Sequence, residues 1–416
     1  MHTVSRFTHM NVRELRHKAR RLLSREIIAL ALLSTLGSQS YADINFGGAA
    51  AADYEYNTNV FDLPGGAYAP GASRRSDWFQ AYGGTLQVND LIGQDKLYAT
   101  LTGKDFRYDY FTYLDHAEYS LNGGFKWQQG TNLDGSVDVL RTRTMVPFTD
   151  VFQVQLALVT TQQERVQLGW VFIPDWRIQG EIDYDSVNQP EVNAPELALT
   201  EKTGQVSLQY IGVAGLSAGI TYTRLRGDFS GADTLTNPNF NQDTLQFVVT
   251  YQPTASSTLI GEGGYSRRTS DSQADTTSGP TGKFTYKNQL TPKTSVSVAF
   301  ERDIINYITN SGSVLNTLGT VGLTWQATYR IGLTADYNYR HSLLPDQGLI
   351  PGTDRVDKYA FYDVKVDYQP TRWLWIEPYI RVQDRTSNYE AAQFNGSAIG
   401  VNFNLLWHCP NNRCAL

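Results

Sequence analysis

The sequence contains little cysteine, methionine or charge, and it has no long apolar run. Its 416 residues include 2 Cys and 3 Met, and 18% are charged. Two cysteines cannot staple a chain of this length, which excludes a disulfide-rich scaffold. The body of the chain has no run of roughly 18 apolar residues and no sustained period near about 3.6. These absences exclude a helical membrane protein and a helical bundle.

The first 42 residues have the features of a secretory signal. Ile27 to Leu36 is a short apolar core that follows several arginines, and Ser40-Tyr41-Ala42 offers small residues at the −3 and −1 positions. This core is too short to cross ~30 Å of hydrocarbon as a helix. We therefore expect cleavage after Ala42 and not a membrane anchor.

The chain beyond residue 42 is acidic. The signal holds 7 of the 35 basic and 2 of the 41 acidic residues, which leaves 28 against 39 and a net charge of −11. Nucleic acid is not an expected partner of such a chain. Cys409 and Cys414 lie in the last eight residues. In an oxidising compartment this spacing favours a small disulfide loop over a metal clip with His408, for which no fourth ligand is evident.

Tyrosine and glycine are abundant, and they occur in alternating segments. The chain has 25 Tyr and 35 Gly. Between Tyr329 and Arg340 every second residue is apolar or aromatic, and the residues between them are polar or glycine. Successive side chains of a strand point to opposite faces of a sheet. The pattern recurs along the chain, so we expect an all-β protein whose strands have one apolar face.

Short turns punctuate the segments at regular spacing. They read Ile173-Pro174-Asp175-Trp176, Tyr251-Gln252-Pro253-Thr254, Leu290-Thr291-Pro292-Lys293 and Tyr368-Gln369-Pro370-Thr371. The repeat of about 40 residues equals two long strands, a tight turn and a long loop. A propeller blade has a similar period but four short strands, whereas a strand of about 11 tilted residues crosses the apolar band of an outer membrane.

We therefore predict one transmembrane antiparallel up-and-down β-barrel over residues 43–407, in the bacterial outer membrane. It has about 18 strands (16–18), short periplasmic turns and long extracellular loops. Residues 408–416 would form a periplasmic tail. The segment Thr142 to Glu164 is ambiguous, because its apolar run Val154 to Val159 is compatible with a lid, an inward-folded loop or an extra strand pair.

Aromatic residues cluster at both ends of the apolar rows, as the interfacial girdles of a membrane barrel do. The expected girdle residues are Trp127, Trp170, Tyr210, Tyr251, Trp325, Tyr368 and Trp407 at the short-turn end, and Tyr184, Tyr222, Tyr337 and Tyr339 at the long-loop end.

The polar faces predict the lining of an aqueous lumen, where charged and aromatic side chains can contact sugars or other solutes. The candidate lining residues are Asp53, Glu55, Arg177, Glu181, Asp183, Glu301, Arg330, Asp336, Asp363, Lys365, Asp367, Trp375, Glu377, Tyr379 and Arg381. The simpler interpretation of such charges is that they pair across strands and stabilise the wall.

The last predicted strand resembles the C-terminal signal that the barrel-assembly machinery reads. After Gly400 it places Phe403, Leu405 and Trp407 on one face. The expected partners are this machinery and the outer-membrane lipids, including lipopolysaccharide.

One stretch resembles a known family. Tyr54 to Pro64 reads Tyr-Glu-Tyr-Asn-Thr-Asn-Val-Phe-Asp-Leu-Pro and follows a strand that opens Asp43-Ile44-Asn45-Phe46. It resembles the first strand and loop of the putative β-barrel porin 2 type outer-membrane proteins. Within that group it is most similar to EpsL-type barrels named from exopolysaccharide-biosynthesis and exosortase-associated loci. Asp62 departs from the family's usual basic residue. The resemblance implies a role in handling exopolysaccharide, with polysaccharide and export proteins as partners.

Three functions remain open. The preferred one is a conduit in exopolysaccharide export, and the alternative is a general small-solute porin, because lining chemistry alone does not name the solute. An outer-membrane lipid-modifying enzyme is the least favoured. Beyond the signal only His116, His341 and His408 occur, and the adjacency of His341 and Ser342 does not make a nucleophile–base pair. With no phosphate loop, metal-ligand cluster or nucleotide motif in the sequence, we expect no catalysis, cofactor or metal.

Overall fold

The computed structural model describes residues 44–149, 154–189, 197–230, 239–271, 276–307, 310–345 and 352–407. The expected signal segment and both cysteines lie outside these ranges. Residues Ile44–Leu416 form one compact unit. No helix in the described ranges is long and apolar enough to cross a membrane.

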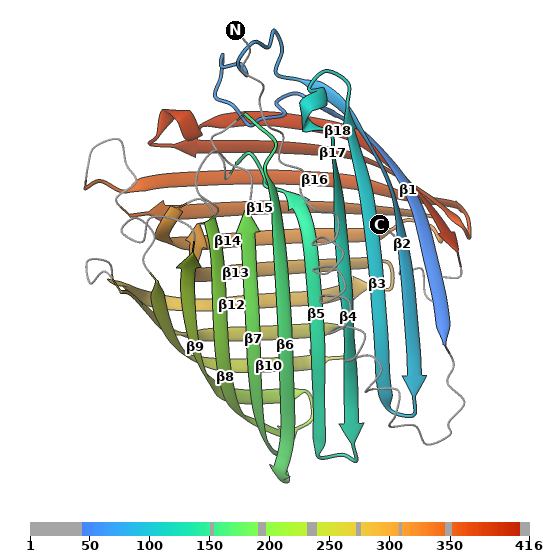
Figure 1. Ribbon diagram of the computed structural model, residues 1–416. Helices are drawn as coiled ribbons and strands as arrows, with labels where there is room; N and C mark the ends of the chain where they lie inside the picture. Colours follow the sequence, from blue (N-terminus) through green and yellow to red (C-terminus); the bar gives the residue numbers. More distant parts are fainter. Residues whose placement is uncertain are drawn as a thin grey trace, which may run out of the picture. The chain divides into compact units, whose positions relative to one another are not determined.

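The described part of the chain forms eighteen strands and two short 3-10 turns (Figure 1). The strands are β1 (Asn45–Asn57), β2 (Asp77–Ile92), β3 (Asp95–Tyr108), β4 (His116–Gln129), β5 (Leu133–Met145), β6 (Leu158–Ile173), β7 (Trp176–Gln189), β8 (Leu197–Val213), β9 (Leu216–Ser230), β10 (Phe240–Thr254), β11 (Ser257–Ser270), β12 (Thr276–Thr291), β13 (Thr294–Tyr307), β14 (Asn310–Gln326), β15 (Ile331–Leu344), β16 (Arg355–Thr371), β17 (Leu374–Ser387) and β18 (Phe394–Trp407). The 3-10 turns are η1 (Thr112–Leu114) and η2 (Glu390–Ala392).

The strands form a single closed sheet. Each strand pairs antiparallel with its neighbours in sequence, and β1 closes the ring by pairing with β18 from Gly48–Trp407 to Asn57–Ala398. The near and far walls cross in Figure 1, as tilted strands of a barrel do. The predicted all-β antiparallel barrel of about 18 strands is confirmed. The propeller alternative is excluded, because its blades would be separate four-stranded sheets.

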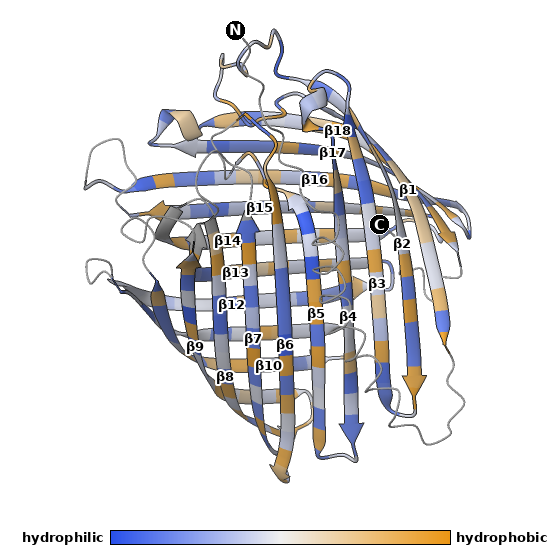
Figure 2. Ribbon diagram, in the orientation of Figure 1, coloured by the Kyte–Doolittle hydropathy of each residue, from blue (hydrophilic) through white to orange (hydrophobic). Residues whose placement is uncertain are grey.

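Apolar residues cover the outside of the ring. Hydrophobic and hydrophilic residues alternate along the strands in Figure 2, and the large apolar side chains of one parity are exposed, such as Ile182 at 67% and Phe247 at 65%. A closed sheet leaves no free edge strand, so wherever neighbouring strands pair, its backbone polar groups are satisfied without water. An apolar belt around a closed barrel is therefore suited to lipid.

The short turns lie at the predicted positions or just beyond them. Those at Pro174 and Pro292 fall between strands, whereas Tyr251–Thr254 and Tyr368–Thr371 form the ends of β10 and β16, and the turns follow directly after them. Asp175 lies between β6 and β7 with a φ of 70°, and Gly215 lies between β8 and β9 with a φ of 75°. Positive φ is needed at tight hairpin turns and is tolerated by Gly and Asp. One turn is longer than expected: β15 begins at Ile331, so Tyr329 and Arg330 belong to the turn after β14.

The ambiguous segment Thr142 to Glu164 is a loop flanked by two long strands. β5 ends at Met145 and β6 begins at Leu158, and these two residues pair with each other. Val146 and Ala157 are buried at the base of the loop. The described residues of this segment thus contain no extra strand pair, and the contacts of the loop, given below, show where it folds.

Candidate functional site

Cross-strand partners place the predicted lining residues on the inner face. Tyr379 pairs with Gly400, which pairs with Glu55, and Asp363 pairs with both Arg381 and Asp336. Residues opposite each other share one face of a sheet, and the residues that alternate with these are the exposed apolar ones. Arg330, which the sequence predicted to line the lumen, lies instead in the turn after β14 and outside the lining rows. Its guanidinium is 5.0 Å from the centroid of the Tyr329 ring.

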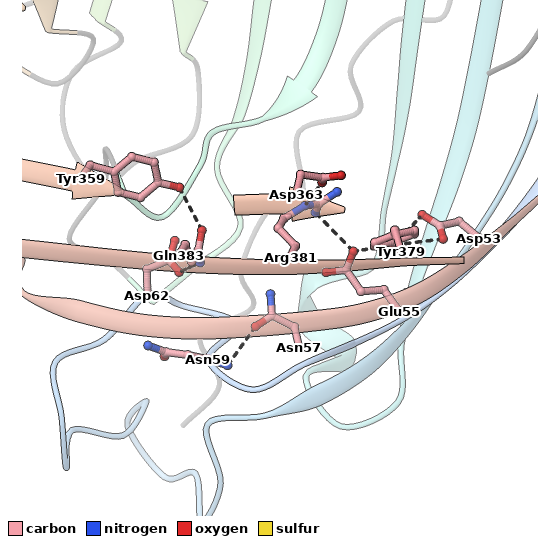
Figure 3. Close-up of polar contacts among 10 residues, drawn as sticks. All are labelled: Asp53, Glu55, Asn57, Asn59, Asp62, Tyr359, Asp363, Tyr379, Arg381 and Gln383. Carbon is pink, nitrogen blue, oxygen red and sulfur yellow. Dashed lines mark hydrogen bonds and ion pairs between the residues drawn. The ribbon is translucent and has the colours of Figure 1, made fainter. Parts of the chain in front are cut away.

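Five of the predicted residues meet in one polar group on β1, β16 and β17, which we call the wall cluster: Asp53, Glu55, Asp363, Tyr379 and Arg381 (Figure 3). Tyr379 Oη donates to Glu55 Oε2 at 2.7 Å and lies 3.2 Å from Asp53 Oδ1. Arg381 contacts Glu55 at 3.4 Å and Asp363 at 3.2 Å.

A glycine on β18 allows the Tyr379 side chain to reach from β17 to β1. Tyr379 lies on β17 and its carboxylate partners lie on β1, with β18 between them. A Cβ at Gly400 of β18 would collide with the Tyr379 ring and the Tyr54 carbonyl. Without a side chain at Gly400, the ring lies flat across β18 and joins the two strands that flank it. The wall cluster thus links β17 to β1 across β18, at the seam where the last strand pairs with the first and the barrel closes.

The wall cluster borders a recess of about 360 Å³ on the inner face. The recess is lined by Asp53, Lys104, Asp336, Asp363, Lys365, Glu377, Tyr379, Arg381 and Asn402. Four carboxylates thus face three cations. Asn402 Oδ1 is buried and has no hydrogen-bond partner among the described residues. Binding sites for small molecules usually measure roughly 300–1,000 Å³ and combine a few convergent polar groups, so the recess has the size and chemistry to hold a small polar solute.

The other predicted lining residues form local pairs or remain apart. Arg177 contacts Asp134 at 2.6 Å, and Glu301 contacts Lys283 at 3.0 Å. Glu181 and Asp183 share Arg165, at 3.5 and 2.5 Å. These pairs fit the simpler interpretation of wall stabilisation. Asp367 lies opposite Gly332 on the inner face, and Trp375 Nε1 is buried without a partner among the described residues.

The predicted girdle residues occupy the outer face at both ends of the barrel. Trp170, Tyr251, Trp325, Tyr368 and Trp407 are exposed at the short-turn end, and Tyr184, Tyr222 and Tyr339 are exposed at the long-loop end. The remaining three, which are half-buried, pack against neighbouring rings: Trp127 on Phe125, Tyr210 on Trp176 and Tyr337 on Tyr362.

Sequence reasoning missed a second feature, a hydrophobic core at the long-loop end of the lumen. Three loops build it, and we call it the mouth cluster: Val60, Phe61 and Ala69 between β1 and β2, Tyr108, Phe111 and Leu114 around the β3–β4 loop, and Phe148 between β5 and β6. Phe79 and Phe106 pack against it. Phe79 pairs with Glu55 and therefore faces inward, so these loops fold into the barrel.

Buried polar groups fix the loops of the mouth cluster. The Asp77 carboxylate, which is 1% exposed, accepts hydrogen bonds from the backbone N–H groups of Tyr110 at 3.1 Å and Phe111 at 2.9 Å. Asn59 Nδ2 donates to the carbonyls of Leu63 and Asn395, both at 2.9 Å. These bonds hold the backbone of the β3–β4 and β1–β2 loops against β2 and β18.

The β5–β6 loop contacts a strand that lies far from β5 along the wall. Arg385 Nη1 on β17 donates to the Thr149 carbonyl at 2.6 Å. Along the wall, β4, β3, β2, β1 and β18 separate β5 from β17. The loop therefore extends past these strands to β17, which leaves the lid and the inward-folded loop as the alternatives for this segment.

The stretch Tyr54 to Pro64 has an architectural role in this structure. Asn57 Oδ1 accepts the Asn59 N–H at 2.9 Å and so starts the loop, while Val60 and Phe61 enter the mouth cluster. Asp62, at φ 49°, accepts a hydrogen bond from Gln383 Nε2 at 2.5 Å (Figure 3). The spacing of the two asparagines before an apolar pair was the available signal for this folded loop.

The two histidines within the described ranges, His116 and His341, show no catalytic arrangement. His116 is buried, with Nδ1 2.6 Å from the Leu114 carbonyl and its ring stacked on Phe106. His341 lies opposite Lys358 and Thr317. In the described ranges no group of three His, Cys, Asp or Glu side chains could hold a metal ion.

Comparison with known proteins agrees with this architecture. Residues 254–405, less than half of the chain, match the family model "Putative beta-barrel porin 2". The chain is a closed antiparallel β-barrel, and this part of it is similar to a family of porin-like barrels. No curated protein sequence matches it.

Solved structures of bacterial barrels are also similar. OccK5 (OpdH) of Pseudomonas aeruginosa is 11% identical with a TM-score of 0.46, and the match covers 88% of this chain and 98% of that one. OccK9 (OpdG) of the same organism is 14% identical with a TM-score of 0.48, covering 88% and 99%. The FrpB iron transporter from Neisseria meningitidis is 11% identical with a TM-score of 0.44, covering 84% and 63%.

Proposed function

We propose that the chain forms a channel for saccharide-type solutes across the outer membrane and takes part in exopolysaccharide export. The observation that carries this proposal is the recess beside the wall cluster. It is lined by carboxylates, cations, a phenol and Asn402, whose buried Oδ1 has no hydrogen-bond partner among the described residues. A polyhydroxyl solute can donate to the carboxylates, and it can accept from Lys365 and Arg381.

The balance of charge supports a neutral or weakly charged sugar. The four carboxylates and three cations of the recess nearly cancel. A lining of one sign would favour ions of the other sign. Tyr379 adds a ring with an apolar face at the edge of the recess, and aromatic faces stack on the C–H faces of sugars. The lining therefore suits hydroxyl groups better than a multiply charged ion.

The inward loops support selective passage over unrestricted diffusion. The mouth cluster packs against inward-facing Phe79 and Phe106, and Arg385 joins the β5–β6 loop to β17. Solute entering at the long-loop end passes beside this folded assembly. A general small-solute porin is the alternative, and it is favoured by the number of polar residues that only form local pairs along the wall.

The proposal is tested by deletion and by transport in vesicles. Deleting the gene should lower surface polysaccharide while intracellular precursor synthesis continues, and the native chain should restore it. In proteoliposomes, Asn402→Leu should slow oligosaccharide entry relative to the native barrel, whereas the matched outward variant Val401→Leu should not. Normal surface polysaccharide in the deletion strain, together with altered uptake of small solutes, would establish the general porin instead.

A further inference from the structure

The lipid-facing side of the barrel carries a groove across β10 to β13. Its volume is about 530 Å³, and its surface is almost wholly apolar. The floor consists of Gly261, Gly263 and Gly282, and the walls are the exposed rings of Phe247, Phe284 and Phe300. In the register Phe247 lies opposite Gly263, and Gly261 lies opposite Phe284, so each ring borders a position without a side chain.

The packing of the barrel does not require two of these glycines. A Cβ added at Gly261 or Gly263 would meet no heavy atom of the described chain within 4 Å. Larger outward residues at these positions would extend the apolar belt and fill the groove. A shallow apolar slot between aromatic walls is the shape that takes an extended acyl chain.

Cations lie beside the groove and above it. Arg302 lines the groove opposite Gly282, and its Nε is buried without a hydrogen-bond partner among the described residues. Arg267 is four residues from Gly263 towards the long-loop end, at an exposed outward position of β11. Asp243 lies opposite Arg267 in the register but contacts Arg224 and Tyr222 instead, and no salt bridge joins Arg267 or Arg302 to a carboxylate of the described chain. Arginine on a lipid-facing surface is costly unless an anionic group meets it.

The hydrogen-bonded pairing between β12 and β13 stops at the level of Arg302. The pairing of β12 with β13 ends at Gly282–Arg302, although in the described chain β12 continues from Thr276 to Thr281 and β13 to Tyr307. Above this level the two strands pair with their other neighbours. Arg302 therefore stands at the base of the gap in the β12–β13 ladder, where its long side chain can extend towards the membrane surface.

We propose that this groove binds lipopolysaccharide, with an acyl chain of its lipid A against the glycine floor and a phosphate between Arg267 and Arg302. Long loops of outer-membrane barrels face outside, which places both arginines in the outer leaflet. The charge is complementary, since an amphiphile with acyl chains below anionic phosphates matches an apolar slot with one guanidinium group beside it and one above it. This inference is independent of what the lumen conducts.

Native mass spectrometry of the detergent-solubilised barrel, titrated with lipid A or with phosphatidylethanolamine, tests the proposal. Gly263→Trp fills the floor, and the double variant Arg267→Gln/Arg302→Gln removes the cations. Gly204→Trp is the matched control, because Gly204 faces outward opposite Ile182 and an added Cβ there also meets nothing within 4 Å. Lys358→Gln controls for loss of an outward charge. Heat-modifiable migration confirms that each variant is folded.

The expected result is lipid A binding on the order of tenfold weaker in Gly263→Trp and in the double arginine variant, because charge-assisted hydrogen bonds and groove contacts are lost. The two control variants should bind like the native barrel, and phosphatidylethanolamine binding should not change. Undiminished lipid A binding in the groove variants would overturn the proposal. So would native dimers or trimers that Gly263→Trp dissociates, since the groove would then be a contact between copies of this chain.

Discussion

Truncating Phe61 should open the mouth of the barrel without unfolding its wall. Phe61 is 3% exposed, and its ring centroid lies 4.7 Å from that of Phe111 and 4.8 Å from that of Phe148. Phe61→Ala removes both ring pairs and leaves a cavity, which costs about 3–5 kcal/mol in a packed core. Each ring pair accounts for about 0.5–1.5 kcal/mol of this.

This cost affects the loops and not the sheet, because the three rings belong to three different loops. Each 1.4 kcal/mol changes an equilibrium about tenfold. The population of barrels with a detached β1–β2 loop should therefore rise by at least about a hundredfold. Arg74 and Arg75 lie in that loop, so limited trypsin digestion reports its release directly.

Three observations are expected for Phe61→Ala: faster cleavage after Arg74 or Arg75, larger or noisier conductance in planar bilayers, and unchanged heat-modifiable migration. Phe247→Ala is the control, since Phe247 is 65% exposed on the lipid-facing side. If cleavage rate and conductance match the native barrel, the three loops do not hold one another in place, and the assignment of the mouth as a constriction is wrong.

Three further substitutions test the seam and the loops. Gly400→Val should lower the temperature of the heat-modifiable transition, because the new side chain collides with the Tyr379 ring. Gly319→Val is the control and should not lower it, because an added Cβ at Gly319 meets nothing within 4 Å. Asp77→Ala should speed amide exchange in the β3–β4 loop, because the N–H groups of Tyr110 and Phe111 lose their acceptor, and an unsatisfied buried N–H such as that of Phe111 costs about 1–3 kcal/mol; native protection would contradict this role. Tyr54→Cys with Val401→Cys should form an oxidative cross-link, since the two residues are paired across β1 and β18, and reduced thiols under oxidising conditions would argue against closure at that register.

The strands could be predicted because their period is local. Alternation and turn residues report on neighbouring positions only, so rows such as Leu333 to Tyr339 identify a membrane face without knowledge of the partner strand. The short turns near Pro174 and Pro253 fixed the repeat. The boundary at Tyr329 was misplaced because apolar alternation runs on into a turn that lacks proline.

The mouth cluster could not be predicted because its contacts join distant segments. Phe61, Phe111 and Phe148 come from three loops, and nothing in the local pattern of any one loop shows that the others meet it. The loop after Met145 was ambiguous for the same reason: its apolar run fits several structures until the Arg385–Thr149 contact is known.

For the wall cluster, the sequence predicted the inward orientation of its residues but not that these five meet. Alternation placed Asp53, Glu55 and Arg381 on the inner face. A repeat of two residues does not indicate which strands become neighbours when the barrel closes. The part played by Gly400 depends on a tyrosine 21 positions earlier in the chain, in the register that pairs β17 with β18. Residue chemistry along one strand carries no information about that register.

The hydrogen bonds that anchor the mouth also constrain the order of assembly. Asn59 bonds to Asn395, and Arg385 bonds to Thr149, which are 336 and 236 positions apart in the chain. Both contacts exist only when the last strands stand beside the first. During insertion the N-terminal loops therefore lack these anchors until β18 reaches β1, and completion of the ring and folding of the mouth become thermodynamically coupled. A chain stalled before its final strand would expose the N-terminal loops to the solvent without these two hydrogen bonds. A protease that cleaves the exposed loops could therefore distinguish it from the finished barrel.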